Sequence, residues 1–396
     1  MQNALKTKPH WLLCVARIFS LWLVLSACQV LNSPLPPTPT SVTISLPLVM
    51  QSEPEETLTP LPLSTASETP TIAPLPTETP TLSPPPQITL LFTGVIVPAR
   101  CVQAAIDERG DANYIYDEVR GFISSADIAV GTLNTTLSDA SIHTGCIQTY
   151  VLVSDSRSAA AANLAGFDVM SVATNHIKNC SGSSCAEDGN QAFLDTLANL
   201  RAYGIQPVGA GLNLEEAMQP VVVDVQGVRF GIVSLGMVEP LAFAGQDTPG
   251  IAELSDENLR AAIDAARQVS DVVIAMPHWG PEDTPDPNTY QLHFAQVAVE
   301  AGADVVVGNH THVVQAIQQI DGIDVFYGLG NFVFDQTWDR AHQQGVMLLL
   351  HFAGADYTGY DLIPTHVDGD GTVHIAGPDE AAEVLQRIEA ASDRLR

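Results

Sequence analysis

Basic residues are scarce in this chain. It carries 16 lysines and arginines against 45 aspartates and glutamates, a net charge of −29, and Lys178 is the only lysine after residue 87. Binding to nucleic acid requires clusters of cations that neutralise phosphates, so we expect no nucleic-acid partner. The excess of acid instead predicts a solvated surface whose charges repel one another and favour solubility.

An apolar run long enough to span a membrane is lacking even at the start of the chain. Lys6 and Lys8 precede a mostly apolar stretch from Trp11 to Ala27. A stretch this short that ends in small residues is typical of a cleaved export signal. Its ending, Leu25 to Cys28, resembles a bacterial lipobox, so residues 1–28 are predicted to be a lipoprotein-type signal peptide with Cys28 as the lipidated residue. An ordinary signal peptide or an uncleaved anchor is the alternative.

Residues 29–87 are poor in apolar side chains and rich in Pro, Thr, Ser and Glu, as in Thr-Glu-Thr-Pro-Thr at 77–81. Such a segment cannot bury enough apolar surface to offset its ordering entropy, and its prolines keep it extended. We therefore expect a disordered tether. At about 3 Å per residue, the tether could hold the domain predicted at residues 88–396 on the order of 100 Å from a membrane.

Cysteine is sparse too. Beyond the first 28 residues only four are present, Cys101, Cys146, Cys180 and Cys185. In an exported protein these invite disulfides, and four cysteines allow three pairings. Cys180 with Cys185 closes the easiest local loop, which leaves Cys101 with Cys146. A zinc knuckle at Cys180 and Cys185 is the alternative.

From residue 88 onward, apolar strands alternate with amphipathic helices. This alternation favours a mixed α/β sheet, or two stacked sheets with helices outside. The predicted strands are Ile88 to Phe92, Asp127 to Leu133, Asp168 to Ala173, Val221 to Val225, Val228 to Leu235, Asp271 to Met276, Val305 to Val307, Ile323 to Tyr327 and Val346 to Phe352. The predicted helices are Tyr114 to Ser125, one ending at Gly166, Gln191 to Tyr203, Ser255 to Val269, Asn288 to Ala301 and Glu383 to Arg394.

The stretch Val305 to Gln315 is the first candidate for a site. Three valines indicate a buried parallel strand, and His310 and His312 follow its end at a spacing of two. Open α/β sheets place their chemistry at the carboxyl ends of strands, and histidine is the commonest metal-binding side chain. An i, i+2 pair in a turn can aim two imidazoles at one small volume.

Three more strand ends carry residues of the same kind. They are Asn175-His176, His278 with Trp279, Gly280 and Glu282, and the stretch Gly330 to Asp335. Singly, each has a structural explanation, since Asn-His can cap a helix and His278 can be a hydrogen-bonded core histidine. Together, four such strand ends predict one common site.

Ten motifs, in order along the chain, carry a resemblance to a known family. They are Ala165 to Val169, Asn175-His176, Leu194 to Leu197, Gly204-Ile205, Val208 to Gly211, His278 to Gly280, Ala301 to Val306, His310, His312, and Gly330 to Asp335. The chain thus resembles the CapA family of poly-γ-glutamate capsule biosynthesis proteins, relatives of calcineurin-like metallophosphoesterases. The resemblance implies a four-layer α/β/β/α sandwich, a two-metal site, and a role in synthesis, export, anchoring or trimming of an anionic polymer.

Site residues also follow from this resemblance. It implies that Asn175, His278 and His310 are metal ligands, that His312 binds the other metal, and that His176 is the catalytic histidine. In such a site two cations clamp a phosphate-like group and activate a water, and His176 protonates the leaving oxygen or stabilises charge.

The chain departs from the family pattern at its acidic positions. Val95 stands where the family has aspartate, Thr132-Leu133-Asn134 replaces Asn-Leu-Glu, and Asn179 replaces another aspartate. Hard divalent cations prefer carboxylate oxygens. We therefore expect one divalent cation, Mn or Zn, or none, and not two.

A different alignment of the weak motifs would change this expectation. In that case Asp127, Asp139 or Asp335 would supply the missing oxygen.

Two functions are compatible with these residues. The first is an envelope-anchored, metal-dependent hydrolase or transferase that acts on a capsule polymer. The second is a catalytically degenerate homologue that binds or scaffolds a capsule or cell-wall polymer. Either would sit on the extracytoplasmic face of the membrane through its lipid anchor, with other capsule-synthesis proteins as partners. A polyanionic ligand would also need a cation, or a cluster of Arg100, Arg157 and Arg201, to offset the acidic domain.

Overall fold

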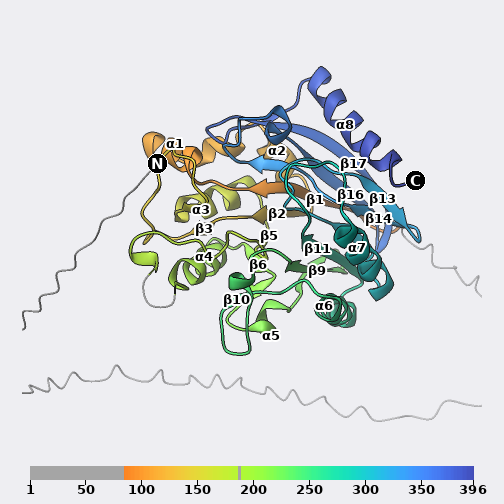
Figure 1. The fold of residues 1–396 in the computed structure, drawn as a ribbon. Coiled ribbons are helices and arrows are strands. Elements are labelled where there is room, and N and C mark those ends of the chain that lie inside the picture. Colours follow the sequence, from red (N-terminus) through yellow and green to blue (C-terminus); the bar gives the residue numbers. More distant parts are fainter. Residues whose placement is uncertain (1–83, 186–188) are drawn as a thin grey trace, which may run out of the picture. The chain divides into compact units, whose positions relative to one another are not determined.

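The computed structural model describes residues 84–185 and 189–396 (Figure 1). The predicted signal peptide, Cys28 and nearly all of the predicted tether lie outside the described residues, so these predictions stay untested. The helices are α1 Cys101–Arg109, α2 Arg120–Ile123, α3 Ser156–Ala165, α4 Gln191–Ala202, α5 Leu214–Ala217, α6 Asp256–Val269, α7 Thr289–Ala301 and α8 Pro378–Asp393, with short 3₁₀ turns η1 Asn113–Tyr116, η2 Ser183–Cys185, η3 Pro240–Ala242 and η4 Arg340–Gln343.

The first sheet has eight strands in the order β18-β17-β16-β1-β2-β5-β6, with β15 also paired to β1. Pairing from β1 through β2 and β5 to β6 is parallel, and β16, β17 and β18 add an antiparallel meander. The bounds are β1 Gln87–Ile96, β2 Ile128–Leu133, β5 Val169–Ser171, β6 Gln206–Val208, β15 Asn331–Val333, β16 Gln344–Ala353, β17 Asp356–Val367 and β18 Val373–Ile375.

The second sheet has six strands in the order β13-β14-β12-β11-β9-β8. Its four central strands are parallel, and β8 and β13 pair antiparallel at its two edges. The bounds are β8 Val221–Val225, β9 Val228–Gly236, β11 Val272–His278, β12 Val305–Val307, β13 Ile317–Ile320 and β14 Ile323–Phe326. Two small ladders, β3 Thr136–Leu137 with β4 Val153–Ser154 and β7 Ala210–Gly211 with β10 Gly250–Ile251, complete the fold.

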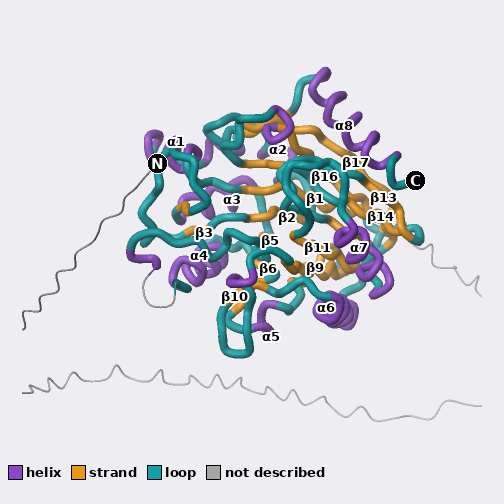
Figure 2. Tube along the Cα trace, in the orientation of Figure 1, coloured by secondary structure: helices purple, strands orange, loops and turns teal. Residues whose placement is uncertain are grey.

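Alternating side chains of the strands divide the core into layers. One set, including Leu90 and Phe92 of β1 and Ile232 of β9, packs between the two sheets. The opposite face of the first sheet packs against α1 to α4, and the outer face of the second sheet packs against α6 and α7. The order is therefore helices, sheet, sheet, helices, which confirms the predicted four-layer α/β/β/α sandwich. Figure 2 shows the strands between helices of the two outer layers.

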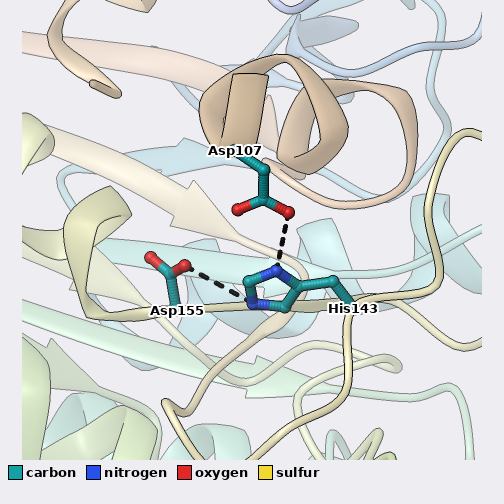
Figure 3. A group of neighbouring side chains, drawn as sticks. All are labelled: Asp107, His143 and Asp155. Carbon is teal, nitrogen blue, oxygen red and sulfur yellow. Dashed lines mark hydrogen bonds and ion pairs between the residues drawn. The ribbon is translucent and has the colours of Figure 1, made fainter. Parts of the chain in front are cut away.

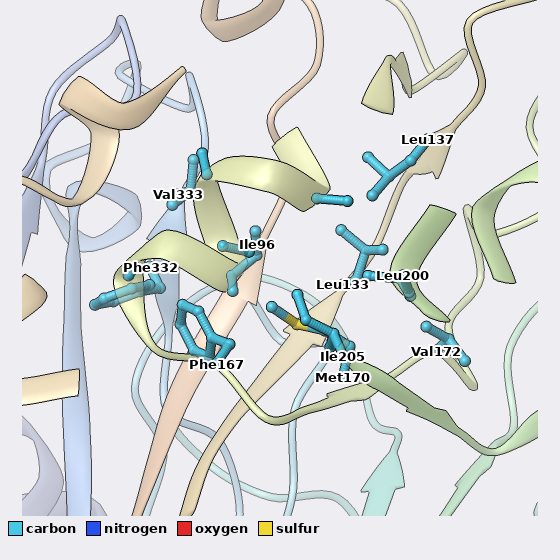
Figure 4. Close-up of a cluster of buried hydrophobic side chains, with 14 of the residues drawn as sticks. Ile96, Leu133, Leu137, Phe167, Met170, Val172, Leu200, Ile205, Phe332 and Val333 are labelled. Carbon is cyan, nitrogen blue, oxygen red and sulfur yellow. The ribbon is translucent and has the colours of Figure 1, made fainter. Parts of the chain in front are cut away.

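The outer cluster of the first sheet shows how the layer closes (Figure 4). Leu133, Met170 and Val172 are buried with Phe167 and Phe332, which lie edge to face at 6.5 Å. Because side chains of a strand alternate between faces, Leu133 and Met170 point to the helices while their neighbours fill the space between the sheets. Both faces of the central strands are thus buried, as their nearly continuous apolar sequence predicts.

Most predicted elements are present, and one helix is wrong. The predicted helix from Tyr114 to Ser125 is instead the 3₁₀ turn η1, a turn, and the four-residue α2. Distant contacts fix this stretch, since Tyr114 donates a hydrogen bond to the Asp370 carbonyl at 2.6 Å and Tyr116 packs on Phe167. Such tertiary contacts override a helical apolar spacing. The structure also adds α1 and the twelve-residue β17, which were not predicted.

Two disulfides are present, Cys101–Cys146 and Cys180–Cys185. The pairing is the predicted one, and the knuckle alternative is wrong because Cys180 and Cys185 bond to each other. The first disulfide ties the start of α1 to the loop between β3 and β4. Within the described residues, no helix combines the length and the apolar character that a bilayer crossing would need.

Candidate functional site

The predicted site residues come together at the carboxyl ends of strands from both sheets. Asn175 and His176 follow β5 of the first sheet, whereas His278 ends β11 and His310 and His312 follow β12 of the second. The strand ends thus come together, but they belong to two sheets and not to the edge of one. Asn331 reaches it from β15, which pairs with β1 in the first sheet.

Three atoms that could bind a metal lie close together at the centre of the site. The Nε2 atom of His278 lies 3.0 Å from Asn175 Oδ1 and 3.1 Å from His310 Nδ1. Ligands about 2.1 Å from a common cation are separated by roughly 3 Å. The two distances from His278 Nε2 are therefore of the size expected between ligands of one cation.

Burial keeps these imidazoles neutral. It lowers the pKa of His278 well below its usual value and lowers that of His310 to about 3, and neighbouring histidines lower both further. Only neutral imidazole has a lone pair to offer a metal. The Nδ1 atom of His278 is buried without a hydrogen-bond partner, whereas metal-binding histidines commonly donate from the second nitrogen.

His312 is oriented by Asn331. Its Nδ1 donates to Asn331 Oδ1 at 2.8 Å, while the Asn331 amide donates to Gln336 and to the His342 carbonyl. The amide is thereby fixed with its oxygen toward His312, which places the ring proton on Nδ1 and the lone pair on Nε2. Burial lowers the pKa of His312 to about 4, so this lone pair is free at neutral pH.

Both histidines of the pair have unusual backbone angles. His310 has φ 105° and His312 has φ 59°, in the left-handed region that residues other than glycine rarely occupy. Such conformations cost on the order of 1–3 kcal/mol each and concentrate at functional sites. The fold holds this turn in a strained form that presents both imidazoles.

His176 borders the same volume and is held by two asparagines. Its backbone N–H donates to Asn134 Oδ1 at 3.0 Å, and its Nδ1 donates to Asn179 Oδ1 at 3.0 Å. Burial lowers the pKa of His176, so Nε2 carries a lone pair. Asn179 therefore takes over the orienting task although it has lost the charge of the family's aspartate.

The departures from the family pattern remove acidic ligands in the structure as well. Val95 is fully buried in a small apolar cluster with Val97, Ala99, Leu152 and Phe334. The Oδ1 atom of Asn134 accepts a hydrogen bond from the His176 backbone N–H, and its buried Nδ2 atom has no partner. The position that holds a carboxylate ligand in the family therefore offers a hydrogen-bond donor, which cannot bind a cation.

None of the three aspartates considered as replacements reaches the site. Asp127 accepts from Thr89 near the start of β1, Asp139 accepts from Ser156, and Asp335 is held by Arg100 and by the Cys101 N–H. Each of these three carboxylates is therefore already engaged by other groups, and nothing in their contacts supports this alternative.

Glu282 is the carboxylate that does face the site. Its Oε1 lies 3.9 Å from Nε2 of His310 and 3.9 Å from Nε2 of His312. Burial raises its pKa, and its side chain remains 45% exposed. The sequence signal was its position just after the His278-Trp279-Gly280 strand end, although no ligand role was assigned to it.

The site opens into a cavity of about 710 Å³. Its lining includes His176, His312, Glu282 and Asp283, together with residues of two segments: Gln148, Thr149, Tyr150 and Leu152, and Phe334, Gln336 and Trp338. The Cys101–Cys146 disulfide anchors the loop that carries the first of these segments. The cavity is therefore lined by two histidines, by an acidic wall formed by Glu282 and Asp283, and by a loop that a disulfide anchors.

The three arginines considered for an offsetting cluster are each already paired with acids. Arg100 pairs with Asp335, Arg157 with Asp107 and Asp155, and Arg201 with Glu216. Indeed, all twelve arginines of residues 84–185 and 189–396 have an acidic partner. Arginine is therefore not freely available to a polyanion on the described part of the chain.

A second group of side chains could hold a metal ion. Ligand atoms of Asp107, His143 and Asp155 lie within 4.8 Å of one another, and Figure 3 shows His143 between the two carboxylates. Its Nδ1 is 2.8 Å from Asp107 and its Nε2 is 3.4 Å from Asp155. Arg157 contacts both carboxylates and already offsets their charge. Sequence reasoning missed this group because its members share no motif.

The mixed α/β fold with two sheets is similar to that of phosphatase and nucleotidase structures. A phosphatase from Mycoplasma pneumoniae superposes with a TM-score of 0.44 and 13% identity, over 71% of this chain and 94% of the other. A putative 5′-nucleotidase from Staphylococcus aureus gives a TM-score of 0.43 and 12% identity, over 77% of this chain and 58% of the other.

Sequence comparison gives the family. The chain belongs to the bacterial capsule synthesis protein family PGA_cap, which matches residues 89–336 and so includes every predicted strand-end ligand. Among its relatives, the PGA biosynthesis protein CapA of Bacillus subtilis is 29% identical over 65% of this chain and 66% of its own length. The capsule biosynthesis protein CapA of Bacillus anthracis is 27% identical over 71% and 68%. The chain thus spans about two thirds of these relatives.

Proposed function

We propose that the protein is an envelope-anchored member of the family that acts on a poly-γ-glutamate-type capsule polymer at a site for one divalent cation, Mn or Zn. The names of the relatives support the polymer, and the two disulfides support an extracytoplasmic location. The lipid anchor at Cys28 and contacts with other capsule-synthesis proteins are parts of the same proposal.

One observation carries the proposal of a cation site. His278 Nε2 lies 3.0 Å from Asn175 Oδ1 and 3.1 Å from His310 Nδ1 at the strand ends, and burial keeps both imidazoles neutral. Without a cation, His278 Nε2 carries a proton and donates it to one of these neighbours, and the buried Nδ1 atom of His278 has no partner. Amide oxygen and imidazole nitrogen suit Mn or Zn, and a bound cation would polarise a substrate oxygen or a water.

The surrounding residues have separate tasks in this proposal. Asn331 holds the His312 ring so that Nε2 faces the cavity, and Asn179 does the same for His176. Because His176 is neutral, it would first accept a proton at Nε2 and then return it to a leaving group. The resemblance implies that His176 protonates the leaving oxygen or stabilises charge, and a neutral His176 must accept a proton before it can protonate that oxygen.

Metal content is the direct test. The full chain is incubated with Mn²⁺ or Zn²⁺, dialysed, and analysed by mass spectrometry of the metal. We expect one equivalent in the wild type and its loss in His278→Ala and in His310→Ala. His293→Ala on α7, a histidine remote from the site, is the matched control. A retained equivalent in both site variants would contradict the proposal.

The second metal-capable group needs its own control. If bound cation disappears in His143→Ala and persists in His278→Ala, the cation belongs to Asp107, His143 and Asp155, and the proposed site is wrong. Arg157 makes this outcome unfavourable, since a cation there would compete with a guanidinium for both carboxylates.

A second candidate function is a binding protein without catalysis. The observation in its favour is that Val95 and Asn134 present an apolar side chain and a hydrogen-bond donor at two ligand positions. No bound cation, together with retained binding of the polymer, would favour this candidate. Cation-dependent cleavage or transfer of the polymer, lost in His176→Ala, would favour the enzyme.

A further inference from the structure

The walls of the cavity differ in chemistry. His176 and His312 lie at its floor, and Glu282 and Asp283 form an acidic wall. Two aromatic side chains at the opening, Tyr150 and Trp338, are 88% and 54% exposed. Large exposed rings beside a cavity are costly in water, and stacking on a ligand would remove that cost.

The cavity has no free cation among the residues that line it. Arg100 is the one basic side chain of the lining apart from the histidines, and Asp335, the Thr149 carbonyl and the Phe334 ring already hold it. Glu282, in contrast, has no closer partner than two neutral imidazoles at 3.9 Å. An unpaired carboxylate therefore faces the ligand, and a negative group of the ligand would be repelled there.

Contacts link each ring to other residues of the lining or to a neighbour of the acidic wall. The Trp338 ring lies 5.5 Å from that of His342, whose Nε2 is 2.6 Å from Asp283. Tyr150 follows Thr149, whose carbonyl accepts a hydrogen bond from Arg100 at 3.2 Å. Aromatic faces combined with carboxylates recognise an ammonium group, because both attract its positive charge.

We propose that this cavity binds an organic ammonium group, and, resting on the proposed function, that the ligand is the amino end of γ-linked polyglutamate. Each internal residue of such a polymer has its amine in a peptide bond and keeps a free α-carboxylate. The amino end alone carries an ammonium. Glu282 pairs with this ammonium and Tyr150 and Trp338 flank it, while Asn175, His278 and His310 would hold the cation that offsets the charge of the carboxylates.

Calorimetric titration of the cation-loaded full chain tests the inference. The probes are a short γ-linked glutamate oligomer with a free amino end and the same oligomer with an acetylated end, which differs by one charge. We expect acetylation to weaken binding about tenfold, as the combined loss of a half-exposed ion pair and a cation–π contact implies. Glu282→Gln should abolish this preference. Glu257→Gln, which removes one exposed charge from α6, should keep it.

Tryptophan fluorescence gives a second readout. Trp338 is half-exposed and Trp279 is fully buried, so binding of the free-amine oligomer should shift the emission of Trp338. The shift should vanish in Trp338→Phe while most of the affinity remains, and Trp338→Ala should weaken the free-amine oligomer more than the acetylated one. Tyr290→Ala, an exposed ring on α7, is the matched control.

The outcomes separate the two proposals. Equal affinity for the two oligomers would overturn the ammonium site and leave the proposed function intact. Failure of both oligomers to bind a cation-loaded protein would overturn the choice of polymer and the ammonium site with it. Preferential binding of a neutral sugar oligomer, with a shift of Trp338, would show that the rings serve a glycan and would also overturn the inference.

Discussion

At the scale of single residues, the site depends on hydrogen bonds that fix where each imidazole proton sits. Asn331 and Asn179 each present an oxygen to a histidine Nδ1, so both rings keep a lone pair on Nε2. Neither partner is charged. The geometry thus survives in a chain that has lost most of the acidic residues of its family.

Replacing Asn331 tests this arrangement. Asn331→Ala leaves the buried His312 Nδ1–H without an acceptor, which costs about 1–3 kcal/mol in the free energy of unfolding. Nitrogen NMR of the imidazoles should show a single Nδ1–H tautomer for His312 in the wild type and a mixture in the variant. Asn331→Asp keeps an acceptor and should restore the single tautomer. An unchanged tautomer in Asn331→Ala would mean that Asn331 does not orient the ring.

His374, remote from the site, should make stability depend on pH. Burial lowers its pKa, but ion pairs with Glu118 and Asp368 at 3.0 Å and 2.9 Å together outweigh burial and raise the pKa above its usual value. A raised folded-state pKa contributes stability that is present below about pH 6.5 and lost as the pH rises through the folded-state pKa.

Urea denaturation at pH 5.5 and 8.5 measures this effect. His374→Gln should destabilise the protein at the lower pH and have less effect at the higher one. Glu118→Gln, which removes one anionic partner, should reproduce part of the loss. A loss that grows with pH would show that the ion pairs do not control His374.

At the scale of elements, one of the two disulfides anchors the loop that lines the cavity. Cys101, at the start of α1, is bonded to Cys146, 45 residues further along the chain. Cys180 and Cys185 are only 5 residues apart. Closing a longer loop removes more entropy from the unfolded chain. The first disulfide should therefore contribute more to stability.

Paired serine variants measure the difference. Chain entropy predicts a loss of about 4 kcal/mol for Cys101→Ser with Cys146→Ser and about 2 kcal/mol for Cys180→Ser with Cys185→Ser. Denaturant titrations of both double variants give the values. The first should also weaken binding in the cavity, because segment 148–152 lines it. The reverse order of stability would show that native contacts, and not chain entropy, control the effect.

At the scale of the whole molecule, charge opposes folding. The net charge is −29, and every described arginine is already paired with an acid. Self-repulsion of the remaining acids is screened by salt, because the Debye length falls from about 10 Å at 0.1 M to about 3 Å at 1 M.

Thermal unfolding across this range of sodium chloride should therefore show a rising Tm. Sodium chloride is chosen because sulfate would also strengthen apolar burial. A falling Tm would mean that salt weakens the surface ion pairs more than it relieves repulsion.

The sequence by itself determined which strands end in candidate site residues. Runs such as Val305 to Val307, followed by glycine and then by His310 and His312, indicate a buried strand with its site at the carboxyl end, and local spacing is enough for that. The same local signals located α6, α7 and the β8–β9 hairpin. They failed at Tyr114 to Ser125, where Tyr116 packs on residues far along the chain.

Only the tertiary structure decided which side chains meet. Asn175 and His278 are 103 residues apart and come from different sheets, and no pattern in the sequence sets the 3.0 Å between them. Nor could the sequence show that Asp335 is held by Arg100 or that Glu282 faces both histidines. The alternation of apolar and polar side chains along a strand depends only on neighbouring residues, so the sequence shows it directly. Contacts across two packed sheets depend on their register and on the space left by every other side chain.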